Sequence, residues 1–179
     1  MRRFTEKKAK HLIDRIISNA CANGNSEVAM GFTVPEGTMF VDGHRGYLFP
    51  ASAPVPNGRS EGAEVMYERF LPYFTNAKKN CTHEIKAPDI MEVKAVARSI
   101  RHKGVPFVYD LGFCFPALNC TYLIDMLEMF PDARVFVNTS SPWAPVLFES
   151  EHGTGIILPV RTESKIHEWY HMRDQRETV

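Results

Sequence analysis

The stretch from Asn119 to Arg161 constrains the fold more than any other part of this 179-residue chain, because it predicts one helix and three strands in direct succession. Asn119 is a typical helix-capping residue, and apolar side chains follow it at helical spacing as far as Phe130, just before Pro131. Short apolar segments between turn residues then predict antiparallel strands. These strands are expected at 133–138, 145–149 and 156–161.

The first fifty residues predict the same kinds of element. Apolar residues from Phe4 to Cys21 recur at helical spacing, and Asn23-Gly24 is a suitable end for that helix. Turn residues at Pro35-Glu-Gly37 and Asp42-Gly43 then separate three apolar segments, so a meander packed on the first helix is expected. Its strands are expected at 27–32, 38–41 and 46–49.

The middle of the chain has a weaker pattern. Residues 50–62 are rich in proline and glycine and predict an exposed connector. Residues 63–77 predict a helix that Pro72 kinks or ends, whereas 89–103 predict a more regular helix closed by Gly104. A strand is expected at 105–111, and the sequence shows no internal repeat.

The predicted helices and antiparallel strands indicate an α+β protein, and its length and composition suit one domain, or one domain with extensions. With 44% hydrophobic residues the chain can bury a substantial core, and its formal net charge of zero provides no global attraction for nucleic acid or an anionic membrane. There is no long apolar run and no signal-peptide pattern after Met1, so we expect a cytoplasmic location without membrane contact. The four cysteines lack metal-ligand spacing and are expected to be free thiols.

Two separated motifs resemble bacterial DNA polymerase III β sliding clamps. The helix beginning Asn119-Cys-Thr-Tyr-Leu, the strand with Pro145-Val-Leu-Phe and the closing Leu158-Pro-Val-Arg161 are similar to the C-terminal end of those clamps. Asp42-Gly-His-Arg45 is similar to a loop of the same family. Together the motifs cover about a third of the chain, in the order that the family has them.

The resemblance implies a DNA-clamp-like domain over residues 1–161, in which helices pack on one side of an antiparallel sheet, followed by a helical tail at 162–179. It also implies a non-catalytic replication accessory that binds clamp-binding peptide motifs of replication proteins. A single domain could enclose double-stranded DNA only as a closed homo-oligomer. By the resemblance, the peptide groove consists of His44, Arg45, Gly46, Leu158, Pro159, Val160 and Arg161.

Local chemistry is compatible with that groove. Pro159 cannot donate to a sheet ladder and so belongs at a strand end, while Gly43 permits a positive φ that turns His44 and Arg45 outward. Gly46 stands where clamps have an apolar wall residue, so the groove is expected to be shallower or already occupied. Each motif alone is equally compatible with an ordinary hairpin turn or strand end.

A DNA-binding surface is less clearly indicated. Lys94, Arg98 and Arg101 form a basic stripe on the helix at 89–103, which is a candidate DNA contact but also typical of a solvated helix face. By contrast, the helix at 119–130 carries Asp125 and Glu128 and no basic residue.

The tail contains the alternative function. His167, Glu168 and His171 fit the His-Glu-x-x-His pattern, in which two histidines bind zinc and the glutamate activates water, so a zinc-dependent hydrolase is the second hypothesis. A third ligand would have to come from Asp174, Glu177 or elsewhere. The simpler interpretation is an amphipathic helix packed on its own domain. The sequence contains no glycine-rich phosphate loop, nucleophile elbow or paired-carboxylate signature elsewhere, and no cofactor is expected.

Overall fold

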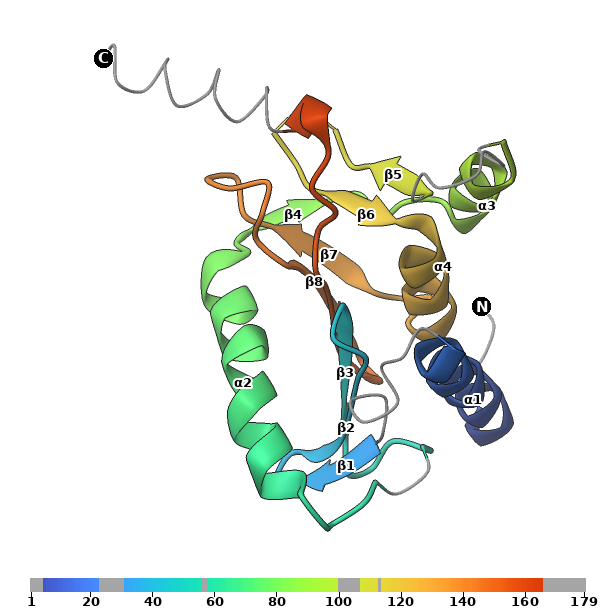
Figure 1. The fold of residues 1–179 in the computed structure, drawn as a ribbon, viewed down its shortest axis with the longest axis vertical. Helices are drawn as coiled ribbons and strands as arrows, with labels where there is room; N and C mark the ends of the chain where they lie inside the picture. The colour runs from blue at the N-terminus through green and yellow to red at the C-terminus, as the bar shows by residue number, and fades with distance from the viewer. Residues whose placement is uncertain (1–4, 23–30, 56–57, 100–106, 113, 166–179) are drawn as a thin grey trace.

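The fold begins with a helix followed by a three-stranded antiparallel meander (Figure 1). The computed structural model describes residues 5–22, 31–55, 58–99, 107–112 and 114–165. The first elements are α1 (Glu6–Ala22), β1 (Gly31–Val34), β2 (Gly37–Val41) and β3 (Arg45–Pro50). The sequence predicts all four, although β1 extends two residues beyond the predicted end at Phe32, and residues 27–30 of that predicted strand lie outside the described part.

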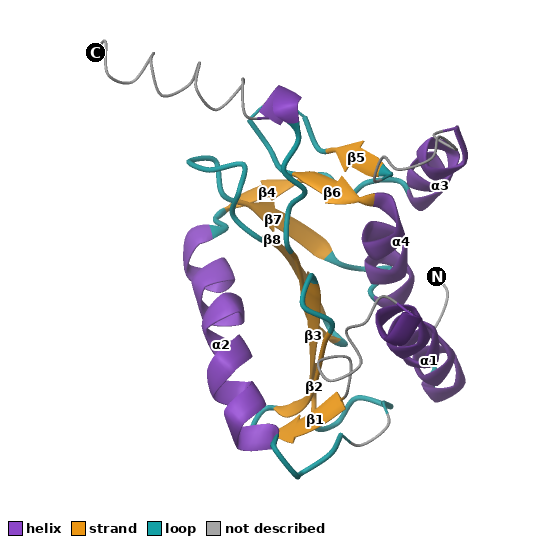
Figure 2. Ribbon diagram, in the orientation of Figure 1, coloured by secondary structure: helices purple, strands orange, loops and turns teal. Residues whose placement is uncertain are grey.

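The last part of the described chain repeats this order. Its elements are α4 (Cys120–Met129), β7 (Arg134–Val137), β8 (Val146–Ser150) and β9 (Gly153–Ile157). Neighbouring strands pair antiparallel, and β3 pairs with β9, so the sheet has the order β1-β2-β3-β9-β8-β7 with β4 (His83–Ile85) added beyond β7. The prediction of an α+β protein with a large antiparallel sheet is therefore confirmed, as Figure 2 shows.

The structure contains an internal repeat that the sequence does not reveal. A helix followed by three strands occurs at each end, and the two copies meet where β3 pairs with β9, so the strand order is symmetric about that pairing. The repeat lies in the order of elements and not in matching side chains. Between the copies lie α2 (Ala63–Asn80), β4, α3 (Ile90–Ser99), β5 (Val108–Asp110) and β6 (Ala117–Asn119).

Helices cover both faces of the sheet, which corrects the expectation that they pack on one side. One face carries a core with α1, α3 and α4, in which Tyr47, Phe49 and Phe148 are fully buried. The opposite face carries α2, whose Phe74 and Ala77 pack with sheet residues of a second core. Figure 1 shows α2 on one side of the sheet and the other three helices on the other.

The helix predicted at 63–77 is present as α2, and it continues past Pro72 to Asn80, so of the two alternatives for this proline, a kink or an end, the structure excludes the end. A proline inside a helix removes one N–H and leaves the carbonyl four residues earlier without its donor. Pro72 and Glu68 both lie on the exposed side of α2, where water can satisfy that carbonyl. Phe74 and Ala77, beyond the proline, are buried and hold the last turns on the sheet.

Two peripheral segments are tied to the sheet more closely than the sequence suggests. The connector is largely exposed, but Arg59 N donates to Gly31 O at 2.7 Å and Arg59 O accepts from Thr33 N at 2.9 Å, which covers the free edge of β1. Beyond Arg161 the chain reaches Lys165, which is buried, with Nζ 2.6 Å from Gly112 O and 2.7 Å from Asp110 Oδ1. Residues 166–179 lie outside the described part.

The helix cap at Asn119 provides a direct test of how α4 begins. Its side-chain oxygen accepts from Thr121 N at 2.8 Å and Tyr122 N at 3.4 Å, as the sequence predicts. Asn119→Ala should lower the free energy of unfolding by about 1 kcal/mol in urea titration, whereas Asn119→Asp should retain the cap. The control Asn76→Ala, at an exposed site within α2, should change it by less than about 0.5 kcal/mol. Equal losses at both sites would contradict the capping role.

Candidate functional site

The turn between β2 and β3 is held by the side chain of Asp42. Its Oδ1 accepts from His44 N and Arg45 N, each at 3.0 Å, and Asp42 N donates to Arg45 O at 3.1 Å. Gly43 has φ of 86°, the positive value expected for this turn. The Asp-Gly-His-Arg motif therefore forms a closed turn at the rim of the sheet.

The two motifs singled out by the sequence lie side by side. Leu158 N donates to His44 O at 2.8 Å, and Arg45 is directly opposite Ile157 where β3 pairs with β9. Strand β9 ends at Ile157, so Pro159 lies just past the sheet, as its missing N–H predicts. Residues from opposite ends of the chain are thus brought to one place.

The segment from Leu158 to Arg161 connects the main sheet with the small β5–β6 sheet. After the bond to His44, Val160 N donates to Ala117 O at 2.8 Å. Arg161 is exposed, and its guanidinium carbon lies 5.8 Å from the centre of the Trp143 ring. This segment is consequently fixed at two backbone positions on either side of Pro159.

Arg45 is buried, so the expectation that its side chain projects outward is wrong. Its side chain is 1% exposed, with Nε 2.7 Å from Asp42 Oδ2 and Nη1 2.6 Å from Asp125 Oδ2. Burial alone would lower the pKa of this guanidinium, but the fields of Tyr47, Asp42 and Asp125 outweigh it and raise the pKa. Arg45 therefore stays charged and serves the interior of the domain.

His44, in contrast, is exposed as predicted. Its ring stacks on Tyr122 with the centroids 5.7 Å apart and the planes 17° from parallel. The Arg45 guanidinium carbon lies 4.6 Å from the centre of the same Tyr122 ring. Tyr122 of α4 therefore contacts the side chains of both His44 and Arg45.

The ion pair of Arg45 extends into a network across three helices. Asp125 of α4 also binds Arg15 of α1, and Arg15 Nη2 lies 2.9 Å from Glu128 Oε2. Glu128 Oε1 in turn lies 2.6 Å from Lys94 Nζ of α3. Burial alone would raise the pKa of Glu128, but its hydrogen bonds from Lys94 and Arg15 lower it. Three carboxylates and three cations form this network: Asp42, Asp125, Glu128, Arg45, Arg15 and Lys94.

The predicted DNA stripe is only partly available. Lys94 is paired with Glu128, Arg98 is exposed on α3, and Arg101 lies outside the described residues. The acidic pair on α4 explains this arrangement, because Asp125 and Glu128 attract the cations of the neighbouring helices. Among the described residues of this stripe, Arg98 is therefore the one that is exposed and forms no ion pair with another described residue.

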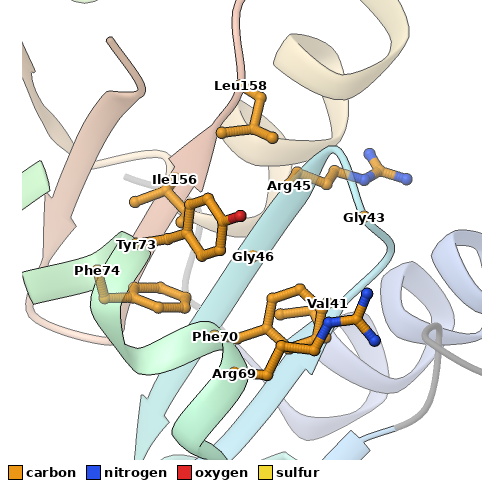
Figure 3. Close-up of a pocket in the computed structure, with 10 residues that line it drawn as sticks. All are labelled: Val41, Gly43, Arg45, Gly46, Arg69, Phe70, Tyr73, Phe74, Ile156 and Leu158. Atoms are coloured by element: carbon orange, nitrogen blue, oxygen red, sulfur yellow. The ribbon is translucent and has the colours of Figure 1, made fainter. Parts of the chain in front are cut away.

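A pocket opens between α2 and the sheet beside the two motifs (Figure 3). Its floor is a row of residues facing each other across three strands: Val41 of β2, Gly46 of β3 and Ile156 of β9. Because Gly46 has no side chain, the row has a gap at its centre. A Cβ placed there would meet Phe74 Cζ at 2.7 Å, so the ring of α2 fills part of the gap.

The pocket as a whole has a volume of about 160 Å³. Leu158 and the turn at Gly43 form one rim, and α2 supplies the opposite wall with Arg69, Phe70 and Tyr73. The expectation of a shallower or occupied groove concerned Gly46, and at this position Phe74 fills part of the space that a side chain would take.

Among the residues predicted for the groove, Gly46 and Leu158 line this pocket and His44 lies next to them. Arg45 lines it while its guanidinium is turned away, whereas Pro159, Val160 and Arg161 lie farther along the chain, outside the pocket lining. The sequence gives no indication that α2 forms a wall. The helical spacing of Phe70 and Phe74 predicts that this helix has a buried face, but it does not indicate which surface that face contacts.

The metal hypothesis concerns residues outside the described part of the chain. His167, Glu168 and His171 all lie beyond Lys165, as do Asp174 and Glu177. Within residues 5–165, apart from the undescribed gaps, no three metal-ligating side chains form a group. Cys81 and Cys120 are free thiols and buried, Cys114 is half-buried, and burial raises the pKa of Cys81 to about 11.

Comparison of the chain with protein families, curated proteins and solved structures finds no match. None of the described helices is long and apolar enough to cross a membrane.

The buried network predicts that replacing one of its carboxylates by a neutral amide of the same shape lowers the stability of the protein strongly. Asp125→Asn removes a charge on which Arg45 and Arg15 both depend and should lower the free energy of unfolding by about 3–5 kcal/mol. As a control, Glu84→Gln breaks the exposed pair with Arg134, 2.5 Å long, and should leave the urea midpoint nearly unchanged. Similar midpoints for the two variants would show that the network contributes no more than a surface pair.

Proposed function

We propose that this protein is a non-catalytic, sliding-clamp-like interaction module that binds a short peptide of a partner protein in the pocket between α2 and the sheet. One observation carries the proposal. The two motifs that resemble the peptide groove of sliding clamps adjoin through the bond from Leu158 to His44, and an apolar pocket opens beside them.

The lining of the pocket favours binding of a peptide. Val41, Ile156 and Leu158 provide aliphatic surface, and Phe70 and Tyr73 add aromatic rings 6.2 Å apart. Anchor residues of peptides gain most of their affinity by filling such pockets. The strand end at Leu158 is also held in place by backbone bonds, so the pocket needs little rearrangement before a peptide binds.

The charges of the described residues support a peptide over DNA. Duplex DNA is bound chiefly by cations that neutralise phosphates. On the face of the sheet that carries α1, α3 and α4, the charges of Lys94 and Arg15 are already paired with Glu128 and Asp125. The resemblance suggests replication proteins as the source of the peptide, and one copy of the chain is sufficient for this binding.

Peptide titration tests the proposal. A labelled peptide with a clamp-binding motif should bind the wild type, and the double variant Leu158→Ala, Tyr73→Ala should bind about tenfold or more weakly, because both residues form pocket walls. Fluorescence anisotropy measures the affinities. Arg45 is unsuitable for this test, since its replacement would break the buried ion pairs.

Val65→Ala is the matched control. Val65 is 68% exposed, lies on the same helix and does not line the pocket, so the affinity should stay at the wild-type value. If the double variant and the wild type bind the peptide equally, the pocket is not the peptide site.

A further inference from the structure

Helix α2 contributes a feature that neither motif contains: a cation at the wall of the pocket. Arg69 is exposed, and its guanidinium carbon lies 5.3 Å from the centre of the Phe70 ring. This contact keeps the guanidinium near the pocket wall, and because the side chain is exposed its N–H groups stay accessible. Figure 3 shows Arg69 next to Phe70 at the pocket.

The two arginines at the pocket differ in what their charges can do. Arg45 is paired with two carboxylates and its guanidinium points away from the pocket. Arg69 forms no salt bridge with any residue that the structure describes. None of the other pocket residues carries a charge, so Arg69 sets the electrostatic preference of this surface.

The volume of the pocket limits what can enter it. An apolar cavity of about 150 Å³ is large enough for one benzene ring. The pocket here, at about 160 Å³, therefore accepts one large apolar side chain and not a folded element. A residue adjacent to that side chain in an extended peptide would lie at the rim, within reach of a long arginine side chain.

We propose that the partner is a peptide in which a large apolar residue enters the pocket and a neighbouring aspartate or glutamate binds Arg69. The inference rests on the proposed function and specifies its ligand. A guanidinium that forms no salt bridge with any described residue, next to an apolar pocket, recognises a carboxylate by paired N–H donors and by charge. Helix α2 acts as the part of the site that selects an acidic sequence context.

Matched peptides test this selection with the full chain. The clamp-motif peptide is prepared with aspartates flanking its apolar residues and with asparagines at the same places, which differ in charge but hardly in shape. The aspartate peptide should bind the wild type about three- to tenfold more tightly, a range typical of a partly exposed ion pair. The preference should shrink as salt is raised.

Two variants locate the source of that preference. Arg69→Gln keeps a good helix former and should bind both peptides with the affinity of the asparagine form. Lys78→Gln removes an equal charge from an exposed position in the last turn of α2, outside the pocket, and should keep the preference. Circular dichroism checks that each variant retains its helix content.

The possible outcomes test the role of Arg69 separately from peptide binding in the pocket. Equal affinity of the wild type for both peptides, or a preference that survives Arg69→Gln, overturns the role of Arg69 and leaves peptide binding intact. Failure of both peptides to bind overturns peptide binding as well. Sedimentation that reveals dimers dissociated by Arg69→Gln would identify a second copy as the occupant of the pocket and reject the peptide partner.

Discussion

The carboxylate of Asp125 is the contact on which the arrangement of the other elements depends. It is buried and binds Arg45 from the β2–β3 turn and Arg15 from α1, so one side chain of α4 fixes a hairpin and a second helix. Buried ion pairs add little net stability compared with apolar packing, but loss of one partner leaves the others charged and desolvated. The network therefore specifies how α1, α4 and the turn fit together. That fit places His44 O where Leu158 N meets it.

Much of the fold could be predicted because its signals are local. Asn119 caps α4 through its own next residues, and the turns at Gly37 and Asp42 separate the strands of the meander. These features depend on neighbours in the sequence. The side of the sheet that a helix covers depends on the whole chain, and the apolar face of α2 is compatible with either side. The prediction that all helices share one side failed for that reason.

The contrast between local signals and contacts with distant residues also explains which parts of the site were predicted. The sequence identified Gly46 as a departure from a wall-forming residue and Leu158 as its neighbour, and both line the pocket. It also placed Arg45 on the outside, because an arginine in a turn is normally solvated. Its acidic partner Asp125 comes from a distant helix and cannot be recognised from spacing. Arg69, Phe70 and Tyr73 were overlooked because nothing in their own segment indicates which surface they face.

The central pairing of the sheet has a consequence for how the chain is made. β3 pairs with β2 on one side, but its neighbour on the other side is β9, which comes much later in the chain, so during synthesis that edge stays exposed until β9 has left the ribosome. Unpaired strand edges recruit other chains, and contacts between distant segments form slowly. Nascent chains of this protein thus pass through a stage in which the first meander is complete but its inner edge is open. Until β9 pairs with it, this open edge is a place where aggregation can start.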